Sequence, residues 1–150
     1  MLLYYLYALS GSREVAFVHE SFQRLMKVVR FANIAFFAGD RTKSFVSMED
    51  ALNLFSKLGN QKAIGVANNN LGTMVLQEQM EAHGTERLFD NSLFGVCISE
   101  IYFVGSNYFN EAIRNGSFEY ELAKDTDDKG PYAKQLANRY FNRGMFLVVS

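Results

Sequence analysis

Few residues of this chain could do chemistry, and their spacing suits no known kind of catalytic or metal site. His19 and His83 fall in separate segments, with no cysteine or carboxylate at the spacing that a metal site needs. The loop at 125–130 begins like a calcium loop, but Lys129 replaces an oxygen ligand and Leu136 stands where the bidentate glutamate belongs. Glycine-rich phosphate loops are missing from the sequence. We therefore expect no enzyme activity, no metal and no cofactor.

The charge balance gives no reason to expect a nucleic-acid partner. Fifteen basic and sixteen acidic residues leave a formal charge of −1, and the basic residues are scattered rather than clustered. The length of 150 residues, about half of them apolar, suits one globular domain. The single cysteine, Cys97, lies in an apolar run and is expected to be a buried, reduced thiol. These features predict a cytoplasmic protein.

The apolar amino terminus, residues 1–9, raises the question of a signal peptide. No Lys or Arg precedes the apolar stretch, which argues against secretion. The stretch is also far shorter than the roughly 20 apolar residues of a membrane-spanning helix. We expect a helix that packs on a neighbour or the cut end of a longer helical array, with no membrane association.

Apolar residues recur at three- and four-residue spacing along most of the chain, which predicts helices rather than strands. Gly39-Asp40 and Gly59-Asn60 provide residues that end helices. Residues 84–95 lack periodicity and read as a long connection. The first three predicted helices run from near Ser12 to Gly39, from 42 to 58 and from 61 to 82. A fourth runs from 96 or 100 to 114, with an extension over 118–123 after a break at Asn115-Gly116. The last runs from 132 to 149, with Pro131 in its first turn.

Small residues recur at a fixed interval in these helices. Ala32 and Gly72 are 40 residues apart, and each is expected where two helices cross closely. With Ser44 and Ala51 on the helix between them, they resemble the longer-period variety of tetratricopeptide repeat, in which helical pairs pack through small residues at fixed places. The resemblance implies an all-α fold of antiparallel helical hairpins stacked as a short α-solenoid.

The second helix of the second repeat comes later in the sequence than the pattern predicts. Gly105 and Ala112 match the second-helix pattern, but they follow Gly72 at a distance that implies an insertion of 21 residues, near 80–100. Segment 137–143 matches another first helix, with no partner helix after it. An apolar ending at 146–149 agrees with this, because a terminal repeat normally turns a polar face to water. We expect residues 1–150 to form a single domain that is a fragment of a longer array.

The resemblance also implies where a partner would bind. Asn33 and Asn70 fall where many such arrays display side chains on their concave groove, and Asn69, Arg139 and Arg143 are further groove candidates. The expected function is a protein-interaction scaffold that binds a peptide or helix of a partner protein in this groove. The alternative is a structural module of a larger signalling protein that self-associates into a homo-oligomer through its apolar ends.

A narrower interpretation concerns Asn33 and Asn70. Asn33 and Asn70 would match amides that hold a peptide carboxylate in chaperone-binding members of the family. The basic residues of that clamp have no counterpart, since Val29 and Tyr140 stand at or near their places. The other interpretation is that both amides hydrogen-bond between helices or to solvent.

Overall fold

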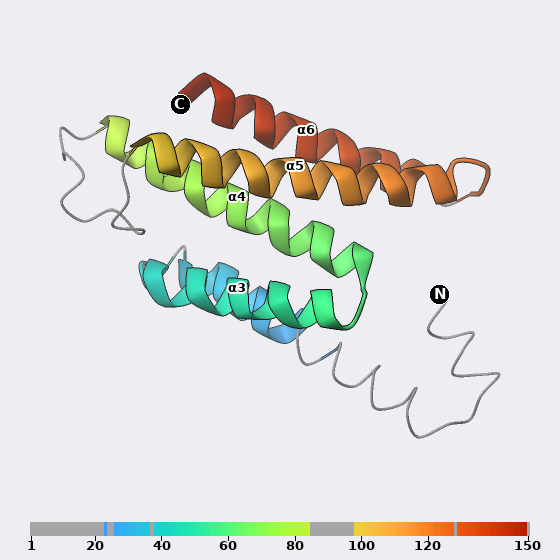
Figure 1. The fold of residues 1–150 in the computed structure, drawn as a ribbon, viewed down its shortest axis with the longest axis horizontal. Helices are drawn as coiled ribbons and strands as arrows, with labels where there is room; N and C mark the ends of the chain where they lie inside the picture. The colour runs from blue at the N-terminus through green and yellow to red at the C-terminus, as the bar shows by residue number, and fades with distance from the viewer. Residues whose placement is uncertain (1–22, 24–25, 37, 85–97, 128, 150) are drawn as a thin grey trace.

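The structure is a computed structural model that describes residues 23, 26–36, 38–84, 98–127 and 129–149. All of these residues lie in helices or in the short turns that join them, with no strand among them, so the predicted all-α class is confirmed (Figure 1). Residues 26–36 form a first helical segment. The helices that follow are α3 (Arg41–Lys57), α4 (Gln61–Gly84), α5 (Ile98–Ala123) and α6 (Lys129–Val149).

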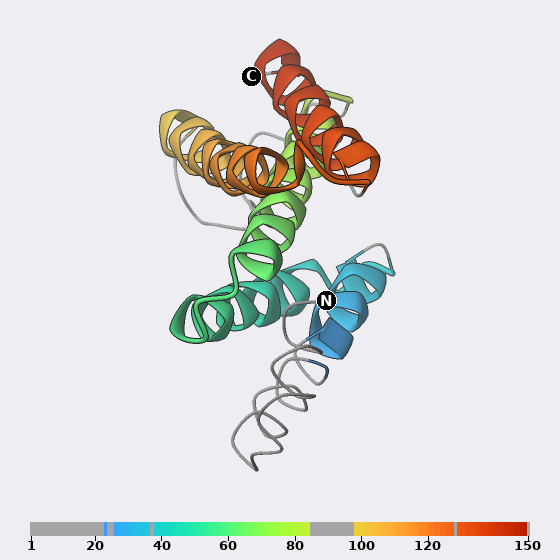
Figure 2. The same cartoon turned by 90° about the vertical axis from the view of Figure 1, so that its right-hand side faces the viewer.

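Helix α4 lies at the centre of the arrangement. It contacts α3, α5 and α6, and α5 also contacts α6. From α3 to α6, each helix runs opposite to the one before it (Figure 1). In the end-on view, segment 26–36 and α6 flank α4 on one side, whereas α3 and α5 flank it on the other (Figure 2).

The turns that end the first two helical segments were predictable from glycine. Gly39 and Gly59 have φ angles of 103° and 65°, a left-handed conformation that glycine adopts without the penalty other residues meet. The side-chain oxygen of Asn60 then caps α4, accepting a hydrogen bond of 2.9 Å from the amide of Ala63. The predicted Gly39-Asp40 and Gly59-Asn60 turns are therefore confirmed.

Helix α5 corrects one prediction. It runs without interruption from Ile98 to Ala123, so the break expected at Asn115-Gly116 is wrong. Asn115 is buried, and its side-chain amide donates a hydrogen bond of 2.8 Å to the backbone oxygen of Glu111. Gly116 faces the guanidinium of Arg139, where a Cβ atom would overlap it. Both residues are therefore used for packing inside a continuous helix.

The other boundaries agree within a few residues, apart from segments that cannot be compared. Helix α6 begins at Lys129 and carries Pro131 in its first turn, as predicted. The expected start near Ser12, the apolar segment 1–9, and most of the insertion near 80–100, including Cys97, lie outside the described residues.

The small residues singled out in the sequence are buried, and one of them lies where two helices approach closely. Ala32, Ser44 and Ala51 are all almost completely buried. Gly72 faces the ring of Phe109, where an added Cβ would come within 2.8 Å of a ring carbon. Close approach of α4 and α5 therefore depends on a missing side chain at this point.

Helices α3 and α5 meet through an aromatic and polar contact. The hydroxyl of Tyr108 donates a hydrogen bond of 2.6 Å to Glu49 Oε1. Its ring meets the ring of Phe45 edge-on, with centroids 6.2 Å apart. Burial, and then the neighbouring carboxylate of Glu49, raise the pKa of Tyr108. The contact thus joins α3 to α5 through one hydrogen bond and a pair of rings.

Gly105 should be intolerant of any side chain. A Cβ there would overlap the ring of the fully buried Phe146. We therefore expect Gly105→Ala to lower the free energy of unfolding by about 1–2 kcal/mol, because the cost of overpacking exceeds the gain in helix propensity. Urea unfolding followed by circular dichroism measures the change. The matched control is Gly144→Ala, also within a helix but in open space, which should be neutral or stabilising by up to about 1 kcal/mol. Equal effects of the two substitutions would contradict the packing argument.

Candidate functional site

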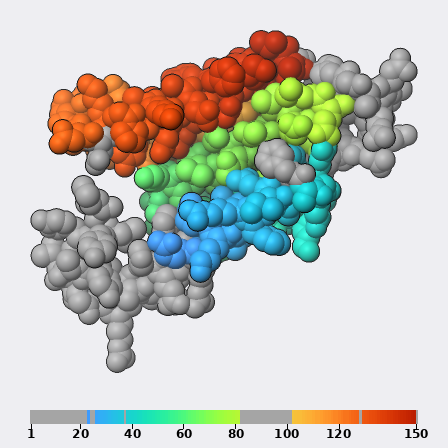
Figure 3. Space-filling view, turned by 180° about the vertical axis from the view of Figure 1, so that it is seen from behind, coloured from blue at the N-terminus to red at the C-terminus, as the bar shows by residue number. Residues whose placement is uncertain are grey.

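A strip of partly exposed, uncharged residues runs along one side of α4. Its members recur at three- and four-residue spacing, between the buried positions of the same helix. We call this strip the polar α4 face; it comprises Val66, Asn69, Asn70, Thr73 and Gln77. Seen from behind, α4 lies between segment 26–36 and α6 (Figure 3).

Some side chains of the polar α4 face already have partners. Asn69 accepts a hydrogen bond of 3.1 Å from the side-chain amide of Asn142, which joins α4 to α6. The hydroxyl of Thr73 donates to the backbone oxygen of Asn69 at 2.8 Å, and Gln77 donates to Glu81 at 2.8 Å. These contacts fix the shape of the face. Asn70, in the middle of the strip, has no hydrogen-bond partner among the described residues.

Asn33 and Asn70 are both partly exposed, and the side-chain amide of neither has a hydrogen-bond partner within the described residues. An amide offers two donors and an acceptor, which is the combination that a peptide backbone can satisfy. Of the predicted groove residues, Asn69 and Arg139 have hydrogen-bond partners, whereas Asn33, Asn70 and Arg143 have none among the described residues. The side chains of Asn33 and Asn70 likewise form no hydrogen bond with each other in this part of the chain. Asn33 and Asn70 are therefore two separate hydrogen-bonding groups.

Arg139 does not face a groove, and the expectation that it would be exposed there is wrong. Its side chain is buried, with 3% of the residue accessible. The guanidinium donates a hydrogen bond of 2.8 Å to the backbone oxygen of Ala112 and lies 3.9 Å from the carboxylate of Glu119. Gly65 of α4 and Gly116 of α5 leave the space that it fills. Arg139 therefore ties α6 to α5 from within the three-helix contact.

The electrostatics around Arg139 reflect its burial. Desolvation raises the pKa of Glu119, against the opposing charges of Arg139 and Lys62. Desolvation also lowers the pKa of Arg139, which Glu119 offsets in part. Lys62 lies over the ring of Tyr132 at 5.3 Å, which brings the amino ends of α4 and α6 together. This group of charges is therefore arranged to hold three helices rather than to bind a ligand at the surface.

Arg143 lies one helical turn beyond Arg139 and is only partly exposed. Its Nε atom is buried and has no hydrogen-bond partner in the part of the chain that the structure describes. The side chain is not brought together with Asn33 or Asn70 by any recorded contact. Arg143 therefore has the same partial exposure as Asn33, Asn69 and Asn70, and Arg139 alone of the predicted groove residues is buried.

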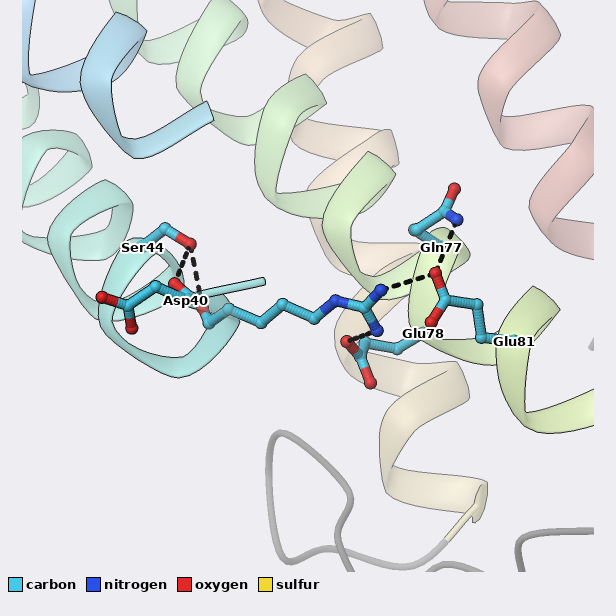
Figure 4. A network of polar contacts seen from close by, with 6 residues as sticks. Asp40, Ser44, Gln77, Glu78 and Glu81 are labelled. Atoms are coloured by element: carbon cyan, nitrogen blue, oxygen red, sulfur yellow. Dashed lines mark hydrogen bonds and ion pairs between the residues drawn. The ribbon is translucent and has the colours of Figure 1, made fainter. Parts of the chain in front are cut away.

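A polar network crosses from the start of α3 to the carboxyl-terminal part of α4 (Figure 4). Arg41 donates to Glu78 at 2.9 Å and to Glu81 at 2.6 Å, and Gln77 donates to the same Glu81 oxygen. The hydrogen bond from Arg41 lowers the pKa of Glu81. Because these groups are partly open to solvent, the network orients side chains at the edge of the polar α4 face and contributes little to stability.

Comparison with known proteins adds no family. No protein-family model, no curated protein and no solved structure matches the chain. Among the described residues, no group of three or more His, Cys, Asp or Glu side chains could hold a metal ion. None of the helices described is both long and apolar enough to cross a bilayer.

Two features of this region escaped the sequence analysis. Asn142 was not among the predicted site residues, although it lies in the segment that resembles a first helix and it pairs with Asn69. The burial of Arg139 had a signal in Gly65 and Gly116, two helical glycines whose missing side chains leave space for a large one. The burial of Arg139 could not be inferred from these glycines alone, because the sequence does not show that α4, α5 and α6 meet at this point.

Proposed function

We propose that the protein is a tetratricopeptide-like α-solenoid scaffold that binds an extended peptide or a helix of a partner protein along the polar α4 face and at Asn33 of segment 26–36. The observation that supports this function best is the pair of partly exposed, unpartnered amides of Asn33 and Asn70. Amides of this kind recognise main-chain or uncharged polar groups. The antiparallel helical hairpins supply a rigid frame for them.

The burial of Arg139 favours an uncharged ligand over a carboxylate. A clamp for a peptide carboxyl terminus needs basic side chains beside the amides. Arg139 is committed to Ala112 and Glu119, and the polar α4 face itself contains no charged residue. We therefore propose that the face reads main-chain and uncharged side-chain groups of its partner.

Ligand selection followed by paired substitutions tests the proposal. A peptide selected from a random displayed library on the wild-type protein should bind Asn33→Ala/Asn70→Ala at least about tenfold more weakly, because two hydrogen bonds worth roughly 1 kcal/mol each are lost. Fluorescence anisotropy of the labelled peptide measures the dissociation constant. The matched control, Asn53→Ala/Asn110→Ala, removes two exposed amides of α3 and α5 and should bind as the wild type does. Equal binding by both double variants would show that the Asn33 and Asn70 amides are not the site.

A second candidate function, self-association, is favoured by a separate observation. Helix α6 exposes large apolar side chains on the side away from the core, including Tyr140 and Phe141. Contiguous apolar groups at the surface mark interaction sites more often than chance exposure does.

A further inference from the structure

Helix α6 is apolar on two opposite sides. One side, with Arg139 and Phe146, is buried against α4 and α5. The other side lies at the outer edge of the described helices (Figure 2). We call it the outer α6 face; its exposed members are Ala137, Tyr140, Phe141, Gly144, Leu147 and Val148. At 100° per residue these six positions fall on one stripe, opposite the buried side.

The outer α6 face has the shape of a helix-packing surface. Ala137 and Gly144 are seven residues apart, so they lie one above the other on the helix. A Cβ added at Gly144 would meet nothing within 4 Å, so the place is open. The rings of Tyr140 and Phe141 project between these two small residues. A second helix could thus approach closely at two points and pack against rings between them.

We propose that the outer α6 face binds the same face of a second copy of this chain, with the two α6 helices antiparallel about a two-fold axis between Tyr140 and Phe141. In such a pair, Ala137 of one copy lies opposite Gly144 of the other, and the Tyr140 and Phe141 rings of both copies gather around the axis at the same level. Extending the register places the half-buried Ala133 opposite Val148, which is 81% exposed. Small residues meet small ones and rings meet rings, which is the self-complementarity that a two-fold interface requires.

The charges of α6 select the antiparallel orientation. Helix α6 contains no Asp or Glu, and its two exposed charged residues, Lys129 and Lys134, lie in its amino-terminal third. In the proposed register Lys134 lies at the level of the last turns of the facing helix, whose partially negative carboxyl end favours a nearby cation. A parallel pair would instead bring lysine against lysine.

This inference rests on the second candidate function, self-association, for which it names the surface and the register, and it is independent of the partner-binding function. The outer α6 face and the polar α4 face share no residue, so either can fail while the other stands. Because one helix on each side supplies the contact, the interface is small, and we expect a weak, reversible dimer that forms as the concentration rises.

Sedimentation equilibrium of two matched variants tests the surface. Phe141 and Phe103 are 65% and 66% exposed, but only Phe141 belongs to the outer α6 face. We expect a monomer–dimer equilibrium for the wild type, a dissociation constant at least about tenfold higher for Phe141→Lys, and no change for Phe103→Lys. A wild type that stays monomeric up to about 1 mM, or equal weakening by both variants, overturns the proposal.

Disulfide cross-linking tests the register. Cys97→Ser removes the only native thiol, and Ala137→Cys or Gly144→Cys is then introduced into separate preparations. After mild oxidation, the mixture of the two should form the mixed 137–144 disulfide, because those positions face each other, whereas identical positions lie about 10 Å apart along the helix axis. Preferential 137–137 disulfides would show a parallel pair and overturn the register. A dimer that is cross-linked equally in all combinations overturns it as well.

Discussion

Replacing Arg139 by alanine is expected to remove about 3–5 kcal/mol from the free energy of unfolding, which is a large share of the stability of a domain of this size. The substitution deletes the cation that faces the poorly accessible Glu119 carboxylate and the donor that binds the Ala112 oxygen. It also leaves a void beside Gly65 and Gly116, since neither glycine has a side chain that could fill it. Urea unfolding followed by circular dichroism measures the loss.

A surface arginine provides the matched control. Arg114 pairs with Glu111 on the same helix at 2.5 Å, but its side chain is 75% exposed, so Arg114→Ala should change stability by less than about 0.5 kcal/mol. A cost for Arg139→Ala no larger than that of Arg114→Ala would show that the buried guanidinium does not hold the helices together.

The contributions of charge and volume at Arg139 can be separated. Arg139→Met keeps most of the volume but still leaves Glu119 without its partner. Adding Glu119→Gln removes the buried charge, and this double variant should recover most of the lost stability, because an uncharged pair of similar size avoids the desolvation that raises the pKa of Glu119. If the double variant is as unstable as Arg139→Ala, shape and the hydrogen bond to Ala112 dominate.

The helices of this fold could be predicted from the sequence because their signals are local. Periodic apolar residues and the left-handed glycines Gly39 and Gly59 fixed two turns to within a residue or two. Small residues such as Ala32 and Gly72 were correctly expected in buried contacts. Each of these inferences depends on a single segment and its immediate neighbours.

The interior glycine and the arginines could not be predicted in the same way, because their environment is built by distant segments. Gly116 looks like a helix end until Arg139, from the next helix, is placed against it. Arg139 looks like a groove residue until two glycines on other helices give it a buried position. Asn33 and Asn70 remain candidates because they are partly exposed and their amides have no hydrogen-bond partner among the described residues.

Truncating Phe146 to alanine is expected to cost about 3–5 kcal/mol, comparable to the loss of Arg139. The ring is completely buried and lies between two others, with centroids 5.6 Å from Phe109 and 5.9 Å from Tyr102. It also faces Gly105, whose missing side chain makes room for it. Chemical denaturation at a concentration that keeps the protein monomeric measures the change. Phe141→Ala, on the same helix but exposed, should cost less than about 0.5 kcal/mol, and equal losses would contradict the burial argument.

A double-mutant cycle with compensating size changes tests whether Phe146 and Gly105 form one packing unit. Gly105→Ala alone overfills the contact, and Phe146→Leu alone leaves part of it empty, so the two changes should compensate when combined. We expect the double variant to be more stable than the sum of the single effects predicts, with a coupling of about 1 kcal/mol between the two positions. Because the contact joins α5 to α6, additive effects would mean that the two helices pack independently of this glycine, and that the missing side chain at Gly105 does not set their approach.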